Sequence, residues 1–379
     1  AVALAAPDDA RLGVLRDGLV LAFAIGLGSA LLLFFGSGPF LDAIGLDAAL
    51  ARGATAAAQV LALSMLPYLL SVALTFWLEA LGRAGMASLL MWGANLLNLA
   101  LNLWLVPGTH VPGIDGAVAS AWATFGARTA LLGMLALYVW RWPQAAQHGL
   151  WQRSSPTGSD MPQLWRIGLA AAGSLFVETT AFAGMNVVAG WLGALETASW
   201  AIVLNVAALV FMVPLGLSSA TAVLVGHAYG ADDKHGVVAA GLRGFISAVA
   251  ILTLICLAVW LGADRIAAAY TRDLAVQALV VPALILSCLF FITDGLQVIA
   301  ANALRARNDV WLPTATHVFS YAFVMLPLGW ALAHPLHGGI NGIVWAAIIA
   351  SLLSAALLLG RFGWLARETP SAGARAAAD

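Results

Sequence analysis

The sequence predicts an all-α membrane protein, a polytopic bundle of long helices, and three observations lead to that prediction. Of the 379 residues, 62% are hydrophobic and only 9% are charged, which is too apolar for a water-soluble protein of this length. Apolar runs of about 20 residues recur between polar breaks, as membrane-spanning helices require, whereas outer-membrane barrels alternate over about 10 residues. The net charge of -1, without a basic block, argues against a nucleic-acid partner.

Hydropathy places ten spans along the chain, and the positive charges sort by side. Of the 17 Lys and Arg residues, 13 fall on one side of the spans, Arg52, Arg265 and Arg272 fall on the other, and Arg128 lies within a span. Because positively charged loops stay inside, both termini are predicted to be cytoplasmic, in a bacterial-type inner membrane. The spans are residues 17–39, 54–78, 86–107, 116–140, 165–192, 197–226, 238–262, 275–303, 312–333 and 340–365.

The longest polar break divides the chain into two predicted lobes. Residues 142–163 are rich in Pro, Ser, Gly and Gln, which is typical of a cytoplasmic linker. An amino-terminal lobe over residues 1–141 therefore precedes it, and a carboxyl-terminal lobe over residues 164–368 follows. Residues 369–379 have the composition of a disordered tail.

An internal repeat supports two lobes of the same topology. The repeat predicts a pseudo-twofold axis along the membrane normal, as in transporters built from parallel repeats. Subtracting an offset of 224 from the spans at 165–192 and 197–226 places their counterparts almost wholly before residue 1. About 60 residues and two helices are therefore expected upstream, for twelve spans in all. The matches are 113–116 with 339–342 (offset 226), 80–81 with 303–304 (offset 223) and 7–9 with 231–233 (offset 224).

Two acidic residues in apolar runs are the strongest functional signal. Glu178 follows Arg166 by 12 residues, which places it about 18 Å into a hydrocarbon core about 30 Å thick, and Asp294 precedes Arg305 by 11 residues, or about 16 Å. A carboxylate at that depth costs about 2.5 kcal/mol or more, so both should face protein or a wet cavity. Two such groups at one level can exchange protons or sodium near neutral pH. A silent, protonated core acid and, for Asp294, a local hydrogen-bond anchor remain alternatives.

Polar side chains at helical spacing extend this patch. Gln297 shares the helix face of the second acid, three residues on. Asn98 and Asn102 lie four residues apart in the amino-terminal lobe and could bond a substrate, although amides between membrane helices also serve as structural links. Asn205 lies in the helix that follows the one with Glu178, and it is a weaker candidate for lining the cavity.

Arg128 is the embedded basic residue, and it should need a buried acidic or carbonyl partner. A structural clamp is the favoured interpretation, and a gate or substrate contact is the alternative. No enzyme signature, P-loop or metal-ligand cluster is evident in the sequence, so we expect a transporter without a cofactor other than H⁺ or Na⁺ as coupling ion.

Two motifs now point to a family. The segments 211–221 (FMVPLGLSSAT) and 225–232 (VGHAYGAD) resemble the eighth helix and following loop of the multidrug and toxic compound extrusion (MATE) transporters. Segments 303–313 and 113–117 are similar to that family's stretch after helix ten and to the start of helix six. The likeness covers the chain from end to end and corresponds to helices three to twelve of a twelve-helix fold with two lobes around a central cavity.

The resemblance implies antiport, in which sodium or protons enter while cationic, amphipathic drugs leave. It also implies that Glu178 and Asp294 match the helix-seven and helix-ten carboxylates involved in cation coupling, and that Asn98 and Asn102 match an asparagine pair on helix five. We further expect a monomer in the lipid bilayer. The alternative is a flippase of lipid-linked or polysaccharide precursors on the related fold.

This chain departs from the family pattern at two positions. Phe290 stands where some sodium-coupled members have a tyrosine, and Ala170 stands where a helix-seven proline is usual. The helix-one aspartate of many members would lie before residue 1.

Overall fold

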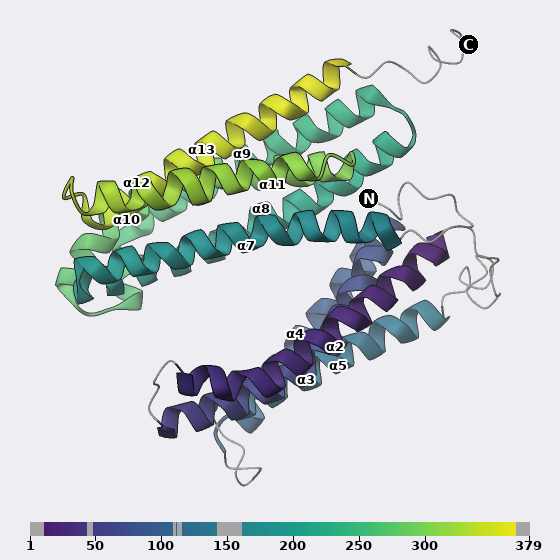
Figure 1. Cartoon of the computed structure of the whole chain (residues 1–379), viewed down its shortest axis with the longest axis horizontal. Coiled ribbons are helices and arrows are strands. Elements are labelled where there is room, and N and C mark those ends of the chain that lie inside the picture. Colours follow the sequence, from purple (N-terminus) through teal and green to yellow (C-terminus); the bar gives the residue numbers. More distant parts are fainter. Residues whose placement is uncertain (1–10, 44–47, 109–110, 112–115, 142–160, 369–379) are drawn as a thin grey trace. The chain divides into compact units, whose positions relative to one another are not determined.

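The computed structural model describes residues 11–43, 48–108, 111, 116–141 and 161–368, and every regular element in these ranges is helical (Figure 1). Two compact units are present, Val2–Leu164 and Trp165–Asp379, which we call the amino-terminal and carboxyl-terminal units. The predicted tail and residues 142–160 of the predicted linker lie outside the described residues. The last three residues of that linker, 161–163, instead begin a helix.

All ten predicted spans are present as helices long and apolar enough to cross a membrane. Most of them continue past the predicted limits, because hydropathy detects only the part of a helix that lies in hydrocarbon. The elements are α2 (Arg11–Ala43), α3 (Ala48–Ala80), α4 (Ala84–Leu105), α5 (Gly116–Arg141), α7 (Met161–Leu192), α8 (Ala194–Gly230), α9 (Lys234–Tyr270), α10 (Leu274–Ala306), α11 (Trp311–His317), the π-helix η1 (Val318–Met325), α12 (Leu326–Ala333) and α13 (Gly339–Glu368).

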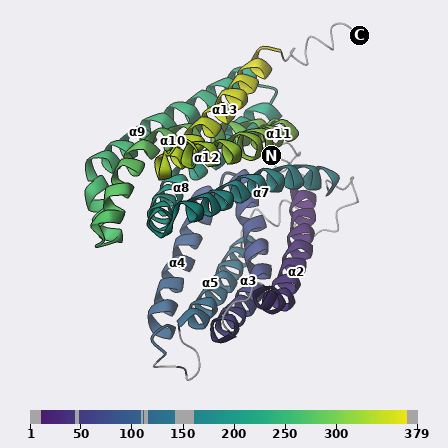
Figure 2. The same cartoon turned by 60° about the vertical axis from the view of Figure 1, so that its left-hand side comes forward.

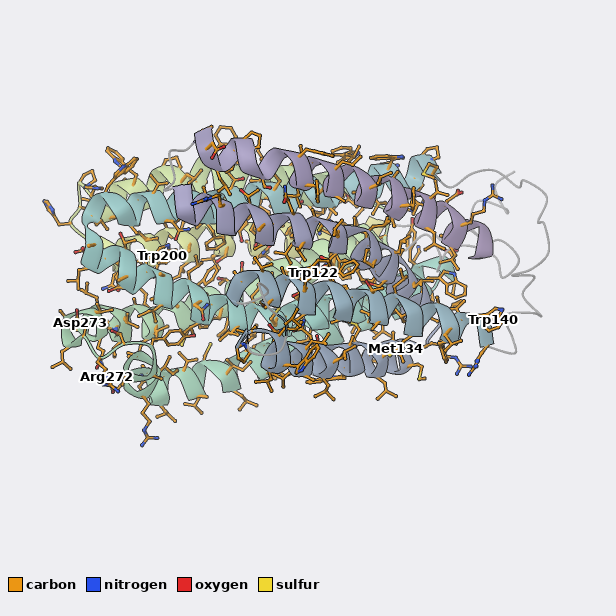
Figure 3. All side chains as sticks on the ribbon, turned by 90° about the horizontal axis from the view of Figure 1, so that it is seen from below. Trp122, Met134, Trp140, Trp200, Arg272 and Asp273 are labelled. Carbon is orange, nitrogen blue, oxygen red and sulfur yellow. The ribbon has the colours of Figure 1, made fainter. Side chains whose placement is uncertain are left out.

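The outer faces of these helices are strongly apolar, and side chains project from them all around (Figure 3). Leu32 is 74% exposed and Leu103 is 70% exposed, and Trp140 near the end of α5 is 61% exposed. Water does not tolerate apolar surface on this scale in a stable monomer, whereas lipid does. The chain is therefore a multi-pass membrane protein.

Three helices end in the same tight turn. Gly82 after α3, Asp232 after α8 and Asn308 after α10 adopt positive φ angles of 75°, 54° and 65°. In each turn the next amide donates to the carbonyl five residues back, at 2.8, 2.9 and 3.1 Å respectively. This Schellman arrangement satisfies carbonyls that the helix end leaves open, and it reverses the chain within a few residues.

The amino-terminal unit consists of four helices that lie side by side in the order α2, α3, α5, α4 (Figure 2). Its core includes Leu74, Trp77 and Leu78 of α3, together with Leu135 of α5. These four side chains are at most 5% exposed. Another part of α2, α3 and α5 lines an apolar hollow of about 560 Å³.

In the carboxyl-terminal unit α10 is central and packs against α8, α9 and α13. The backbone approach is close at Gly295, where an added Cβ would meet Leu252 of α9 and Pro214 of α8. Any larger residue at this position, one after Asp294, would require the buried Leu252 side chain to move. The core of the unit therefore holds the acidic residue of α10 at a fixed place between helices.

The predicted repeat is visible in the order and packing of the helices. Adding 224 to the bounds of α2, α3, α4 and α5 gives 235–267, 272–304, 308–329 and 340–365, which match α9, α10, the α11–η1–α12 span and α13. The contacts correspond as well, because α2–α3, α3–α5 and α4–α5 are the counterparts of α9–α10, α10–α13 and α12–α13. Among the described residues, α7 and α8 have no counterpart in the amino-terminal unit.

Candidate functional site

The two predicted acids lie together inside the carboxyl-terminal unit. Glu178 is near the middle of α7 and is 9% exposed, and Asp294 on α10 is 4% exposed. The two carboxylates are close enough to interact through their charges. Both therefore face protein rather than lipid, as their cost in hydrocarbon requires.

Asp294 is held by two hydrogen bonds to one of its oxygens. The hydroxyl of Tyr321 on η1 donates to Oδ1 at 3.1 Å, and Nε2 of Gln297 donates to the same oxygen at 3.2 Å. Tyr321 and Gln297 are fully buried, and Oε1 of Gln297 has no partner among the described residues. Two donors aimed at a buried carboxylate stabilise its ionised form and fix its orientation.

Glu178 has a different environment, with charges nearby but no hydrogen-bond donor acting on it in the described part of the chain. The nearest positive charge is Arg305 of α10, which interacts with Glu178 electrostatically. Its guanidinium is bonded elsewhere, through Nη2 to Ser174 Oγ at 2.8 Å and through Nη1 to Asn302 Oδ1 at 3.1 Å. Ser174 lies one turn before Glu178, so Arg305 is held beside the acid without forming an ion pair with it.

An α7 to α11 link holds this arrangement together. Thr314 Oγ1 donates to the carbonyl of Ala170 at 2.7 Å, and Ser174 Oγ donates to Thr314 Oγ1 at 3.1 Å. Gly173 lies between them, and an added Cβ there would stand 3.3 Å from the Thr314 methyl group. The bonds lie one to two turns from Glu178, and they fix the depth of α7 relative to α11.

Three aromatic rings border the acids on one side. Phe182, one turn after Glu178, lies edge-on to Phe290 with centroids 5.8 Å apart and tilted against Tyr321 at 6.2 Å. Phe290 lies one turn before Asp294 and carries no hydroxyl. The tyrosine hydroxyl that this position lacks comes instead from Tyr321 on another helix.

The π-helix η1 explains how Tyr321 reaches the site. Single widened turns inside α-helices shift the side-chain direction and occur often at functional positions. His317, the last residue of α11, lies edge-on to Tyr321 at 5.7 Å and is 2% exposed. Neither ring nitrogen of His317 has a hydrogen-bond partner among the described residues.

The structure does not bring Asn205 into the acid cluster. Asn205 is exposed on α8, and its Oδ1 accepts a hydrogen bond from the Tyr270 hydroxyl at 2.6 Å. The bond joins α8 to the end of α9. A structural link accounts for this residue better than a place in the acid site.

The other predicted polar residues belong to the amino-terminal unit. Asn102 Nδ2 donates to the carbonyl of Asn98 at 2.9 Å and to its Oδ1 at 3.1 Å. Asn102 also lines a hollow of about 550 Å³ with Ser120 of α5. The two amides are therefore joined to one another, and one of them borders open space within its unit.

Arg128 of α5 has partners of an unexpected kind. Its Nη1 donates to Ser64 Oγ at 2.7 Å, and the guanidinium lies over the Tyr68 ring at 4.3 Å. Among the described residues, the partner is thus not the acidic or carbonyl group that the sequence led us to expect. A hydroxyl and an aromatic face of α3 serve instead, because cation–π contact also stabilises a partly desolvated guanidinium. The contacts tie α5 to α3.

Comparison with known proteins gives the family. The MatE family model matches residues 9–104 and 170–331. A protein of Caulobacter vibrioides named as a probable multidrug resistance protein NorM is 49% identical over 353 residues, which cover 93% of this chain and 75% of that protein. The chain belongs to the MatE family. Members are transporters, so this MatE-family chain is a membrane transporter and not an enzyme.

Further relatives and solved structures agree with this assignment. A probable multidrug resistance protein NorM of Mesorhizobium japonicum is 33% identical over 364 residues, covering 93% of this chain and 76% of that one. The outward-facing structure of a multidrug resistance MATE family transporter matches with a TM-score of 0.87 at 17% identity, over 97% of this chain and 84% of that one. The eukaryotic MATE transporter AtDTX14 matches with a TM-score of 0.81 at 19% identity, over 97% and 82%. These structures show that the MatE-family chain shares their fold.

Two residues of the MatE-family site were not identified from the sequence. Tyr321 gave little signal, since a tyrosine in an apolar run is ordinary and its reach depends on η1. Arg305 was used only as a marker for the end of a span. It lies 11 residues after Asp294, which is three helical turns on the same face, and that spacing could have identified it.

Proposed function

We propose that this chain is a cation-coupled antiporter, in which H⁺ or Na⁺ moves inward as a cationic, amphipathic organic compound leaves the cell. The observation that carries the proposal is the buried pair Glu178 and Asp294, with Arg305 as the neighbouring positive charge. The steps below follow from the charges and contacts of that pair.

The charge balance requires a mobile cation. With both carboxylates ionised and Arg305 protonated, the site carries one unbalanced negative charge. An uncompensated charge inside a protein costs several kcal/mol, even after relaxation. A site that changes its exposure from one side of the membrane to the other is therefore far more stable with a bound cation than empty, and this is what obligatory exchange needs.

The two acids are not equivalent. Asp294 accepts hydrogen bonds from Tyr321 and Gln297, which stabilise its ionised form. Glu178 has Arg305 nearby as a charge but no donor of its own among the described residues. We assign Glu178 as the group whose occupancy changes most between the two exposures, and Asp294 as the group that completes the ion's surroundings.

Competition for the same negative charge links the two cations. The relatives from Caulobacter vibrioides and Mesorhizobium japonicum carry names that refer to multidrug resistance. For this chain we infer organic cations as substrates, because a positive charge lowers the energy of the acid site whether it comes from H⁺, Na⁺ or the substrate. Binding of the coupling ion then neutralises the carboxyl-terminal unit and releases the substrate outward.

The charges disfavour the flippase alternative. Carriers of lipid-linked sugars handle pyrophosphate-bearing substrates and need a cationic cavity. The described charges of this site are the acids Glu178 and Asp294 and one arginine, Arg305, which is already bonded to Ser174 and Asn302.

The test uses the full chain in proteoliposomes with a pH- or sodium-sensitive dye inside. Glu178→Gln and Asp294→Asn are each expected to abolish substrate-driven H⁺ or Na⁺ flux, because they remove the carboxylates and keep the shape. Matched controls are Glu196→Gln on α8 and Asp264→Asn on α9, which change acids outside the site. Normal flux in either site variant, at equal protein content, refutes the proposal.

A further inference from the structure

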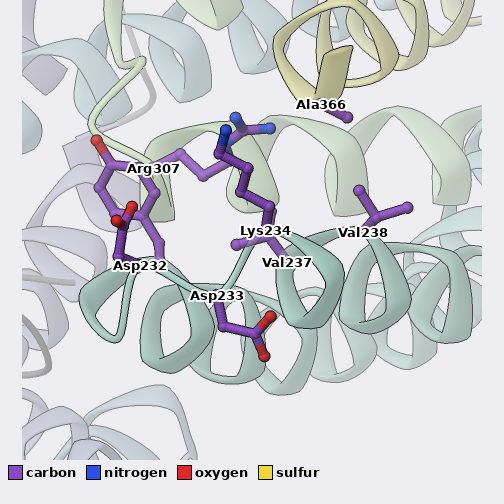
Figure 4. Close-up of a pocket in the computed structure, with 8 residues that line it drawn as sticks. Asp232, Asp233, Lys234, Val237, Val238, Arg307 and Ala366 are labelled. Carbon is purple, nitrogen blue, oxygen red and sulfur yellow. The ribbon is translucent and has the colours of Figure 1, made fainter. Parts of the chain in front are cut away.

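A small pocket at one end of the carboxyl-terminal unit lies apart from the acid site (Figure 4). It is bounded where α8 and α10 end, where α9 begins, and by the last turns of α13. Its volume is about 30 Å³, and one water-sized group needs about 10–15 Å³, so two such groups fit. Its polar lining consists of Tyr229, Asp232, Asp233, Lys234 and Arg307.

Arg307 is the unusual member of this pocket, because it is buried and only partly bonded. It is 8% exposed, and its Nη2 donates to the carbonyl of Leu365 at 3.1 Å. Nε and Nη1 are buried without a hydrogen-bond partner among the described residues. Burial lowers the pKa of Arg307 from its ordinary value, while Tyr229 and Asp309 act in the opposite direction. The Phe362 ring, whose centroid is 5.5 Å from Arg307 Cζ, offsets part of the cost of burying this guanidinium, and the two unbonded donors leave the rest uncompensated.

Two of the three acidic residues nearby have partners outside the pocket, and the third, Asp232, adds a negative charge to its lining. Asp233 caps α9, with its Oδ1 accepting from Gly236 N at 2.9 Å, and in Figure 4 its carboxylate points away from the ends of Lys234 and Arg307. Asp309 Oδ2 accepts from Arg361 Nε at 2.8 Å. The charged ends of Lys234 and Arg307 point the same way in that view.

Backbone geometry holds the two basic residues in place. The tight turn after α8 brings Lys234 to the first position of α9, and the tight turn after α10 begins at Arg307. The left-handed residues of these turns are Asp232 and Asn308. These two tight turns therefore place Lys234 and Arg307 at the pocket without long flexible loops.

The depth of the pocket identifies the ligand class. The helices α8 and α10 end at Gly230 and Ala306, and α9 begins at Lys234, each about 5–6 Å past the hydropathy spans that end at 226 and 303 and begin at 238. The pocket thus lies at the level where lipid phosphates meet water. We propose that Arg307 and Lys234 bind the phosphate group of a membrane lipid, with the two side chains supplying the positive charge that faces it.

The experiment measures thermal unfolding of the purified, delipidated full chain in neutral detergent. The probes are dioctanoyl phosphatidylglycerol, dioctanoylglycerol as the same acyl chains without phosphate, and inorganic phosphate. At ten times the dissociation constant, the phospholipid should raise the Tm by about 2–4 °C, and dioctanoylglycerol should not. Arg307→Gln and Lys234→Gln should each lose that shift. Arg243→Gln, which removes an exposed charge from the same helix as Lys234, should keep it.

Each outcome decides the question. If inorganic phosphate produces the same shift and Arg307→Gln abolishes it, the site recognises phosphate from either source, and the phosphate chemistry stands. If only the phospholipid does so, the lipid headgroup is the ligand. Equal shifts in the parent, Arg307→Gln and Lys234→Gln overturn the proposal, as does no shift in the parent. Should Arg307→Gln fail to fold, Lys234→Gln with its Arg243→Gln control decides alone.

Discussion

Replacing Tyr321 by phenylalanine deletes one atom from the acid site, the hydroxyl oxygen that lies 3.1 Å from Asp294 Oδ1. The ring keeps its edge contact with His317 and its packing against Phe182. Gln297 remains as the other donor to the same carboxylate oxygen. The variant therefore isolates one hydrogen bond to Asp294 without opening a cavity.

The size of the effect follows from the kind of bond that is lost. A hydrogen bond to a charged partner contributes about 1.5–3 kcal/mol, and each 1.4 kcal/mol corresponds to a factor of ten. Tyr321 donates to the ionised form of Asp294, so its removal favours the cation-bound form of the site. We expect the coupling-ion concentration for half-maximal exchange to fall by about tenfold to a hundredfold. Ion release becomes slower, so the maximal rate should fall as well.

The assay is the initial rate of organic-cation exchange in proteoliposomes, measured against the outer proton or sodium concentration at fixed substrate. Tyr270→Phe is the matched control, since it deletes a tyrosine hydroxyl that donates to Asn205 in the same unit but outside the acid site. The control should leave the half-maximal concentration unchanged.

The direction of the change is what tests the reasoning. A rise in the half-maximal concentration for Tyr321→Phe would mean that the hydroxyl is an ion ligand rather than a donor to Asp294. An unchanged value, equal to that of Tyr270→Phe, would show that the bond to Asp294 plays no part in coupling. Either result refutes the assignment made from the geometry.

Two further predictions concern stability. Arg128→Gln should lower the free energy of unfolding by about 1–2 kcal/mol, because it removes the bond to Ser64 and a cation–π contact. The coupling-ion dependence of exchange should stay unchanged. Loss of substrate binding would contradict the interpretation of Arg128 as a structural clamp. Gly342→Ala should lower the free energy of unfolding by about 1–3 kcal/mol, because the new Cβ would lie 2.6 Å from backbone atoms. The control, Gly360→Ala on the same helix, places its Cβ in open space. In the same denaturation assay it should be neutral or slightly stabilising.

Much of the fold follows from the sequence because a bilayer imposes simple rules. A helix that crosses hydrocarbon must be apolar over about 20 residues, so all ten spans could be located from composition alone. The repeat was equally accessible, since duplicated helices keep their spacing along the chain. The π-helix over Val318–Met325 was not, because its widened turn depends on how the surrounding helices pack and leaves no sign in hydropathy.

The sequence predicted the two acids of the site, but it did not predict the arginine or the contacts made by other helices. Glu178 and Asp294 could be identified because an acid in hydrocarbon is costly wherever its partner lies. The number of residues between each acid and an arginine near the end of its helix then predicted that both acids lie at the same level of the membrane. Which donors reach Asp294 depends on rotation of the helices about their axes, and sequence spacing fixes that only within one helix. Gln297, on the same helix, was therefore predicted, and Tyr321, on another, was not.

The two units share a scaffold but not its charges, and this asymmetry constrains the mechanism. At the offset of 223 that matches α3 with α10, the counterparts of Asp294 and Gln297 are Ser71 and Leu74, neither of which is ionisable. At the offset of 226 that matches the starts of α5 and α13, the counterpart of Arg128 is Ser354, which is also not ionisable.

A duplicated helix pattern alone therefore cannot explain the acid site. Acidic side chains at equivalent positions would be expected in both units if they stabilised the scaffold, because the same packing recurs in each. Among the described residues, the position equivalent to Asp294 carries no acid, which favours a role for Asp294 in binding, since a buried acid is costly unless its charge is used. The proposed coupling-ion site therefore belongs to the carboxyl-terminal unit, and in the amino-terminal unit Arg128 ties α5 to α3.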